Sequence, residues 1–214
     1  MVLRYIAHSC FQLILENGKR ILFDPFSERV GYDMAGTEAD IVLTSHAHYD
    51  HGCTEKVSGG TVLVNEPGDY KIDSVRIMGF STFHDKENGT KRGKNTAFKV
   101  FAEGLNILHC GDIGHLMDDE LLGRIGAVDV ALVPVGGYYT IDATESAMLC
   151  MSLGAPVIIP MHYRTPSCTL PIASVSEFVE KVYATFECGF LDACEVELDK
   201  LPPGVYVLKN SFGE

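Results

Sequence analysis

The segment SHAHYDH, residues 45–51, places three histidines and one aspartate within seven residues. Burying such side chains without partners costs several kcal/mol each, so a cluster of them favours a bound cation that satisfies all of them at once. Three further residues of the same kinds follow singly along the chain. The whole set of candidate metal ligands is His46, His48, Asp50, His51, His84, Asp112 and His162.

This set of five imidazoles and two carboxylates suits divalent metal ions. Its ligand types favour Zn²⁺ above all, with Mn and Fe also open. One catalytic zinc needs only three protein ligands and a water, so the set is large enough for two ions. Two ions about 3.5–4 Å apart can hold a bridging hydroxide, because coordination lowers the pKa of water to about 7. We therefore expect two divalent metal ions, a hydrolytic reaction and a catalytic Asp50 that accepts the proton of the nucleophile.

The candidate ligands lie just past apolar runs of the sequence. SHAH follows IVLT, FHD follows MGFST, GD follows NILHC, and MHY follows VIIP. Ligand sites in α/β folds lie at the carboxyl ends of strands, because the strand is rigid and the loop after it is free to direct side chains. The sequence therefore predicts one site at the ends of several strands.

Strands dominate the expected structure up to residue 101. VLRYIA, FQLILE and RILFDP predict three short strands, with Gly18 in the turn between the last two. IVLTS and TVLVN, residues 41–45 and 61–65, are continuously apolar, which is typical of strands buried on both faces. The remaining expected strands lie in KIDSVRIMGF, NTAFKVFA, NILHCGD, DVALVPV and PVIIPMHY.

Two segments carry helical patterns. DATESAMLCMSLG has an Asp or Thr cap, Glu145 in its first turn and Gly154 as a stop. SVSEFVEKVYATFECG, residues 174–189, carries apolar residues from Val175 to Phe186 at helical spacing. The strand–helix–strand unit at 128–162 fits a parallel α/β arrangement. The pattern as a whole predicts an α/β fold in which sheets pack together with helices outside.

Composition narrows the classes of protein and partner. A chain of 214 residues fits one domain, 1–214, and its net charge of −12 disfavours nucleic acid and membrane as partners. The basic segment KENGTKRGK, residues 86–94, is interpreted as a solvated loop. No signal peptide is recognised, and seven scattered cysteines suit reduced thiols, so we expect a cytoplasmic protein that acts on a small-molecule substrate. A homo-oligomer remains open.

The same residues resemble a known family. HAHYDH matches the HxHxDH signature of the metallo-β-lactamase superfamily, and the later His, Gly-Asp and final His follow in that superfamily's order. AHSCFQLILENGKRILFDPF is similar to the opening of its small UPF0173/UlaG-like hydrolase branch, and HCGDIG to that branch's YHAGDTG. PVGGYYTIDATESAMLCMSLGAPVIIPMHY is similar to its segment that ends in P-M-H-Y. The resemblance covers residues 4 to about 165.

The resemblance implies a fold and a ligand assignment. The fold is the four-layer αββα metallo-β-lactamase-like sandwich, with its site at the edge between two sheets. The implied ligands of one metal are His46, His48 and His84, those of the other are Asp50, His51 and His162, and Asp112 bridges both. The chain departs from the family pattern at Cys110, Ile113 and His115, which removes no ligand and weakens inference about the substrate.

Several further residues are candidates for contact with the ligands or the substrate. His8 ends the first strand, and Asp24 in FDPF could orient a ligand imidazole by accepting its other N–H. Tyr138, Tyr139 and Thr140 follow a Gly-Gly pair and are proposed to line the pocket; a connector that covers the core is the alternative. His109 is expected to be structural and His115 to lie on the surface. Loops 26–39 and 86–95 are expected to set the substrate.

The leading functional hypothesis is a hydrolase of a small ester, lactone or phosphodiester. A mononuclear iron oxidoreductase of the dioxygenase type is the alternative enzyme class, although His48 differs from the Glu of the diiron HxExD pattern. A non-catalytic module stabilised by metal is the third hypothesis, but structural zinc sites are usually closed and rich in cysteine. β-Lactams and RNA are not expected substrates.

Overall fold

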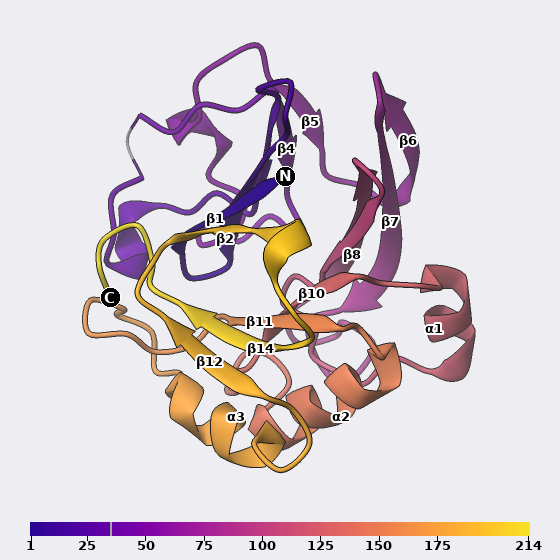
Figure 1. The fold of residues 1–214 in the computed structure, drawn as a ribbon, viewed down its shortest axis with the longest axis vertical. Coiled ribbons are helices and arrows are strands. Elements are labelled where there is room, and N and C mark those ends of the chain that lie inside the picture. Colours follow the sequence, from indigo (N-terminus) through magenta and orange to yellow (C-terminus); the bar gives the residue numbers. More distant parts are fainter. Residues whose placement is uncertain (35) are drawn as a thin grey trace.

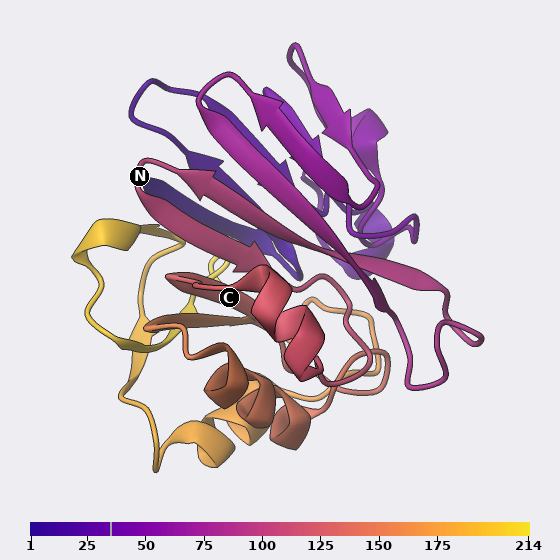
Figure 2. The same cartoon turned by 90° about the vertical axis from the view of Figure 1, so that its right-hand side faces the viewer.

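Two β-sheets pack face to face in the computed structural model, which describes residues 1–34 and 36–214 (Figures 1 and 2). The first sheet has six strands and begins the chain. Its spatial order is β13 (Glu195–Glu197), β1 (Val2–Ala7), β2 (Cys10–Ile14), β3 (Arg20–Phe23), β4 (Ile41–Leu43) and β5 (Val62–Val64). The pairs β3–β4 and β4–β5 are parallel, so these strands end at the same edge.

The second sheet has eight strands. Its spatial order is β12 (Cys188–Leu191), β14 (Gly204–Leu208), β11 (Val157–Met161), β10 (Val130–Pro134), β9 (Leu105–His109), β8 (Lys94–Ala102), β7 (Val75–Phe83) and β6 (Gly68–Ile72). β9, β10, β11, β14 and β12 are paired in parallel, and the other half is antiparallel. The carboxyl ends of β9, β10 and β11 therefore lie side by side.

The main core fills the space between the sheets. Alternation along β3 sends Ile21 and Phe23 into this core, while Leu22 packs into a second cluster on the outer face. β4 behaves in the same way, with Ile41 and Leu43 inside and Val42 outside. Both strands are thus buried on both faces, which confirms the prediction for the start of segment 41–45.

The three α-helices lie on one side of the molecule (Figure 2). Asp142 caps α2 (Ala143–Leu153) by accepting from Thr144 and Glu145 N–H, and Gly154 ends it with φ of 60°, as the sequence predicts. α2 packs against α3 (Val175–Val182) and β10. α1 (Asp119–Ile125), which begins after Asp118, was not expected.

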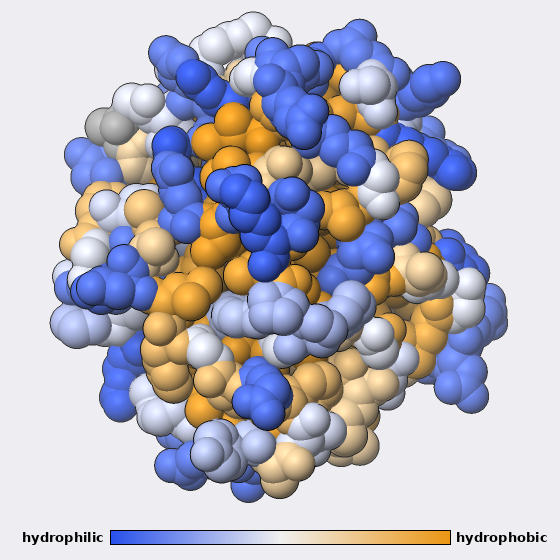
Figure 3. Space-filling model, in the orientation of Figure 1, coloured by the Kyte–Doolittle hydropathy of each residue, from blue (hydrophilic) through white to orange (hydrophobic). Residues whose placement is uncertain are grey.

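The arrangement is a sandwich of two β-sheets with α-helices outside one of them. The outer faces of the two sheets are covered differently. The outer face of the six-stranded sheet is covered by the described parts of the segment after β3, which include a short 3₁₀ helix at Glu28–Val30. Val30 and Tyr32 pack there against Leu22 and Val42. Figure 3 shows apolar residues between the ends of the two sheets and hydrophilic residues around the periphery.

KIDSVRIMGF is β structure as predicted, divided between β6 and β7 by a turn at Asp73, where φ is 53°. Two other expectations about elements were wrong. Segment 61–65 is not buried on both faces, because β5 is an edge strand with Val62 44% and Leu63 48% exposed. The helix predicted over 174–189 ends at Val182, because Cys188–Leu191 pairs with β14 instead.

Among residues 1–34 and 36–214, no helix is both long and apolar enough to cross a lipid bilayer.

Candidate metal centre

The seven candidate ligands meet at one end of the sandwich, each in a segment that follows a strand. The segment 45–51 comes shortly after β4, and His84 follows β7 directly. Asp112 lies three residues past β9, and His162 follows β11. Residues separated by more than a hundred positions thus reach one place, because the strands that carry them end at a common edge.

A tight turn gathers the first four candidates. The amides of His51 and Gly52 both donate to the carbonyl of His48, at 3.0 and 2.8 Å. The turn brings the ring of His46 to 4.5 Å from that of His48 and 4.4 Å from that of His51, measured between centroids. A Cβ at Gly52 would lie 3.2 Å from the carbonyl oxygen of His46, so this turn leaves little room for a side chain there.

Asp112 lies at the middle of the cluster. Its Oδ2 atom is 3.2 Å from His51 Nε2, 3.3 Å from His84 Nε2 and 3.2 Å from His162 Nε2. The carboxylate is 1% exposed, and its Oδ1 atom has no hydrogen-bond partner in the part of the chain that the structure describes. One carboxylate oxygen therefore faces three imidazoles from three different segments.

The potential ligand atoms form three overlapping groups, and the atoms of each group lie within 4.8 Å of one another. One group contains His46, His48 and His84, and another contains His8, Asp50, His51 and His162. The third contains His46, His51 and Asp112, so it shares a histidine with each of the other two.

Orphaned polar atoms test whether this set fits a metal. Several buried atoms of the cluster have no hydrogen-bond partner within residues 1–34 and 36–214. They are both ring nitrogens of His8 and His162, Nε2 of His46 and His51, Nδ1 of His84, and Oδ1 of Asp112. Buried polar atoms are rarely left unpaired, so lone pairs gathered in this way fit cations that accept them.

The charges of the cluster point the same way. Burial lowers the pKa of His51, but Asp112, Asp24 and Asp50 outweigh burial and raise that pKa well above its usual value. The pKa of His46 falls to about 3 and that of His8 to about 4, in both cases chiefly because burial penalises the charged form. The three buried carboxylates that raise the pKa of His51 would equally favour divalent cations, and the lowered pKa values of His46 and His8 favour the neutral imidazoles that bind metal.

Asp24 and Ser45 stabilise the turn at residues 45–51 through hydrogen bonds. Asp24 is 1% exposed and accepts from His51 Nδ1 at 2.7 Å and from the amide and hydroxyl of Ser45 at 2.6 and 2.7 Å. Burial raises the pKa of Asp24, but His51 and His109 outweigh it and lower the pKa. An ionised carboxylate only accepts, so His51 Nδ1 carries a hydrogen, and Nε2 is the ring atom left to bind a cation in place of a proton. The structure thus places Asp24 where the sequence interpretation put it.

Asn95 supports Asp112, and sequence reasoning missed it. Asn95 Oδ1 accepts from the amide of Asp112 at 2.9 Å, and its Nδ2 donates to the carbonyl of Cys110 and to Thr82 Oγ1. The available signal was an amide side chain, Asn95, at the start of the apolar strand pattern NTAFKVFA. Gly111, with φ of 57°, lets these groups approach, because a Cβ there would lie 2.3 Å from Asn95 Oδ1.

The other histidines fall into three environments. His8 Nε2 lies 3.5 Å from Asp50 Oδ2, and its ring is 4.3 Å from that of His162. His109 is fully buried; it stacks on Phe23 and places Nε2 2.8 Å from the carbonyl of Ser9, as a structural residue would. His115, expected on the surface, is only half-buried, because its Nε2 accepts from the amide of Phe83.

A cavity of about 310 Å³ opens onto the cluster. Its lining includes the candidate ligands His48, Asp50, His84 and Asp112, together with Tyr49, Lys91, Arg92, Tyr139 and Leu170. Of the three residues expected to line the pocket, only Tyr139 lines this cavity. Tyr138 and Thr140 line a neighbouring depression, which also touches Tyr139.

Known proteins resemble the chain over most of its length. A family model described as a β-lactamase superfamily domain matches residues 2–162. A UPF0173 metal-dependent hydrolase from Thermoplasma volcanium is 31% identical over 74% of this chain and 81% of its own length. A protein of the same description from Methanoculleus marisnigri is 31% identical over 77% of this chain and 82% of its own length.

Solved structures give the same picture. A candidate Zn-dependent hydrolase of the metallo-β-lactamase superfamily from Thermotoga maritima matches with a TM-score of 0.80 and 34% identity, covering 97% of both chains. Igni18, a metallo hydrolase from Ignicoccus hospitalis, matches with a TM-score of 0.64 and 24% identity over 86% of this chain and 90% of its own. The second likeness concerns the fold alone.

Proposed function

The chain belongs to the UPF0173 metal-dependent hydrolases of the β-lactamase superfamily, and from this premise we propose that it uses two divalent metal ions to hydrolyse a small ester, lactone or phosphodiester. The observation that carries the proposal is the contact of one Asp112 oxygen with His51, His84 and His162. A carboxylate oxygen in contact with histidines of both groups suits a ligand shared by two cations.

The two groups of donors have distinct roles in this proposal. His46, His48 and His84 would hold one ion, and Asp50, His51 and His162 the other, with Asp112 shared. When bound, such ions supply hydroxide at neutral pH and polarise a carbonyl or phosphoryl oxygen. Zn is the ion this donor set favours, with Mn and Fe as further candidates.

The protein's own groups then place and accept protons. Asp50 lines the cavity, so its carboxylate can take the proton that the nucleophile loses. His8, 3.5 Å from Asp50 Oδ2, is the neighbour that can position this carboxylate or receive the proton from it. Asp24 fixes the orientation of His51, and Asn95 fixes the backbone of Asp112.

The cavity suits a small-molecule substrate. Its volume of about 310 Å³ lies at the lower end of the usual range for ligand pockets, about 300–1,000 Å³. Tyr139 and Leu170 give the lining of the cavity an apolar and aromatic part. We also propose that all 214 residues act as one domain, because strands from both ends of the chain share one core.

Replacing Asp50 by Ala tests the proposal. We expect loss of hydrolysis of 4-nitrophenyl esters and bis(4-nitrophenyl) phosphate, together with loss of about one metal ion per chain, measured by mass spectrometry. Asp129→Ala is the matched control, since Asp129 is a half-buried carboxylate that binds Asn106 away from the cluster. Full activity of the Asp50 variant with one ion per chain would contradict the two-metal mechanism.

A further inference from the structure

The loop between His84 and Asn95 is a basic segment in an acidic protein. The chain carries 17 basic and 29 acidic residues, yet four of the basic ones, Lys86, Lys91, Arg92 and Lys94, fall within nine positions of this loop. The loop starts at a candidate ligand and ends at the residue that supports Asp112. Its positive charge is therefore built next to the metal cluster.

Asp85 holds this loop in one shape. Its Oδ1 accepts from the amides of Glu87 and Gly89 at 2.8 and 2.9 Å, and its Oδ2 from those of Lys91 and Arg92 at 2.9 and 2.8 Å. A carboxylate that binds four amides of one loop fixes where the side chains of residues 91 and 92 begin.

The cations of the loop differ in their surroundings. Lys86 pairs with Glu145, and Lys91 pairs with Glu87. Within residues 1–34 and 36–214, no carboxylate forms an ion pair with Arg92 or Lys94. The guanidinium of Arg92 lies over the ring of Tyr139, 5.4 Å from its centroid, which holds it at the cavity that both residues line.

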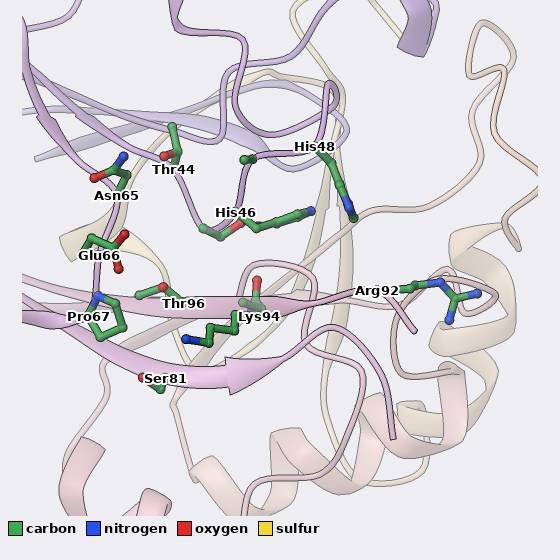
Figure 4. Close-up of a pocket in the computed structure, with 13 residues that line it drawn as sticks. Thr44, His46, His48, Asn65, Glu66, Pro67, Ser81, Arg92, Lys94 and Thr96 are labelled. Atoms are coloured by element: carbon green, nitrogen blue, oxygen red, sulfur yellow. Dashed lines mark hydrogen bonds between the residues drawn. The ribbon is translucent and has the colours of Figure 1, made fainter. Parts of the chain in front are cut away.

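Of these two cations, Arg92 alone reaches the cavity at the cluster. Arg92 lines the cavity that contains Asp50 and Asp112, whereas Lys94 does not. Both side chains line a second groove of about 400 Å³, which also includes Ser81 and Glu66. Figure 4 shows these two side chains pointing in opposite directions, Lys94 toward Pro67 and Ser81 and Arg92 away from them.

We propose that Arg92, with Lys91 beside it, binds an anionic group of the substrate, so that the enzyme acts on small molecules carrying a carboxylate or phosphate next to the bond that is cut. A planar guanidinium that is held by an aromatic ring and lacks an ion pair suits bidentate binding of either anion. Because the protein is acidic overall, a local cation is needed to offset repulsion of such a substrate. The inference rests on the proposed hydrolase function.

The test compares a neutral and an anionic ester, 4-nitrophenyl butyrate and mono(4-nitrophenyl) succinate, on metal-loaded protein. Arg92→Gln should lower kcat/KM for the anionic ester about ten-fold or more, through KM, and change the neutral ester less than about two-fold. Lys94→Gln removes the same charge from the same loop and should change neither ester by more than about two-fold. Metal content should be equal in all three proteins.

Equal losses on both esters, or the same effect from Arg92→Gln and Lys94→Gln, would overturn the inference. If the metal-loaded wild type cleaves neither ester, the hydrolase proposal fails for these substrates and the anion site is tested by calorimetric titration with succinate and with inorganic phosphate. Any anion bound by the metals alone binds both variants equally. A selective loss of about ten-fold in Arg92→Gln supports the site, and the anion that shows it identifies the preferred group; equal affinity of the two variants overturns it.

Discussion

Replacing Asp24 by Asn would keep the size of a buried side chain and remove its charge. In the wild type the amide of Ser45 donates to Asp24 at 2.6 Å, and the side-chain oxygen of Asn can still accept this bond. The side-chain NH₂ of Asn would face His51 Nδ1 and cannot accept its hydrogen. A hydrogen bond to a charged group contributes about 1.5–3 kcal/mol. At about 1.4 kcal/mol for each factor of ten, the loss corresponds to roughly 10–100-fold weaker metal binding.

This loss should be confined to the ion that His51 would hold. Competition with a chromophoric chelator measures the affinities of the two ions separately. We expect one of the two affinities, that of the ion proposed to be held by His51, Asp50 and His162, to fall while the other does not change. Asp129→Asn is the control, because it removes a carboxylate that binds Asn106 far from the cluster. Unchanged affinity of both ions in the Asp24 variant would refute the orienting role of Asp24.

Three further predictions concern packing, acid stability and the cavity. Gly111→Ala places a Cβ 2.3 Å from Asn95 Oδ1 at a φ of 57°, so the free energy of unfolding in urea should fall by about 2 kcal/mol or more. Gly123→Ala is the control, because a Cβ there meets nothing within 4 Å and should cause no such fall. Similar stabilities of the two variants would count against the close approach at Gly111. Burial lowers the pKa of His109, so the contribution of this residue to stability is complete above the unfolded pKa of about 6.5 and is lost as the pH falls. The free energy of unfolding should therefore drop less between pH 7.5 and 5.5 in His109→Gln than in the wild type. Equal drops in the two proteins would contradict this. Tyr139→Phe should change KM with metal content unchanged, while Tyr138→Phe, at a side chain 67% exposed outside the cavity, should leave KM as it is; the reverse result would show that the cavity is not the binding site.

The position of the candidate site could be predicted because it depends on strand ends. Apolar runs that lead into His or Asp predicted residues at the edge of a sheet, and the order of these residues in the family signature then singled out His84, Asp112 and His162 as candidate ligands. Asp24 was identifiable for the same reason, since it follows β3 directly.

The supporting residues were less predictable. Asn95 and Ser45 act through hydrogen bonds to groups 17 and 21 positions away, and no local pattern encodes such pairs. The basic segment 86–94 was interpreted as a solvated loop, because its charge is visible in the sequence while the four amides bound by Asp85 are not. Its conformation brings Arg92 to the cavity.

Edges of sheets were the other source of error. TVLVN has the composition of a central strand, but β5 is the last strand of its sheet and exposes Val62 and Leu63. The hydrophobicity of a strand indicates how well the strand suits burial, but it does not indicate whether a second strand pairs with each of its edges. The helix predicted through 189 ends early for a similar reason, because pairing with β14 competes for Cys188–Leu191.

Metal content per chain tests the two-ion centre most directly. Mass spectrometry on protein purified without added metal or an affinity tag should find near two zinc or manganese ions per chain. Near one iron per chain would contradict the two-metal hydrolase and favour oxygen chemistry. Folded protein that holds no metal and takes up none would contradict the assignment of the histidine and aspartate cluster as a metal centre.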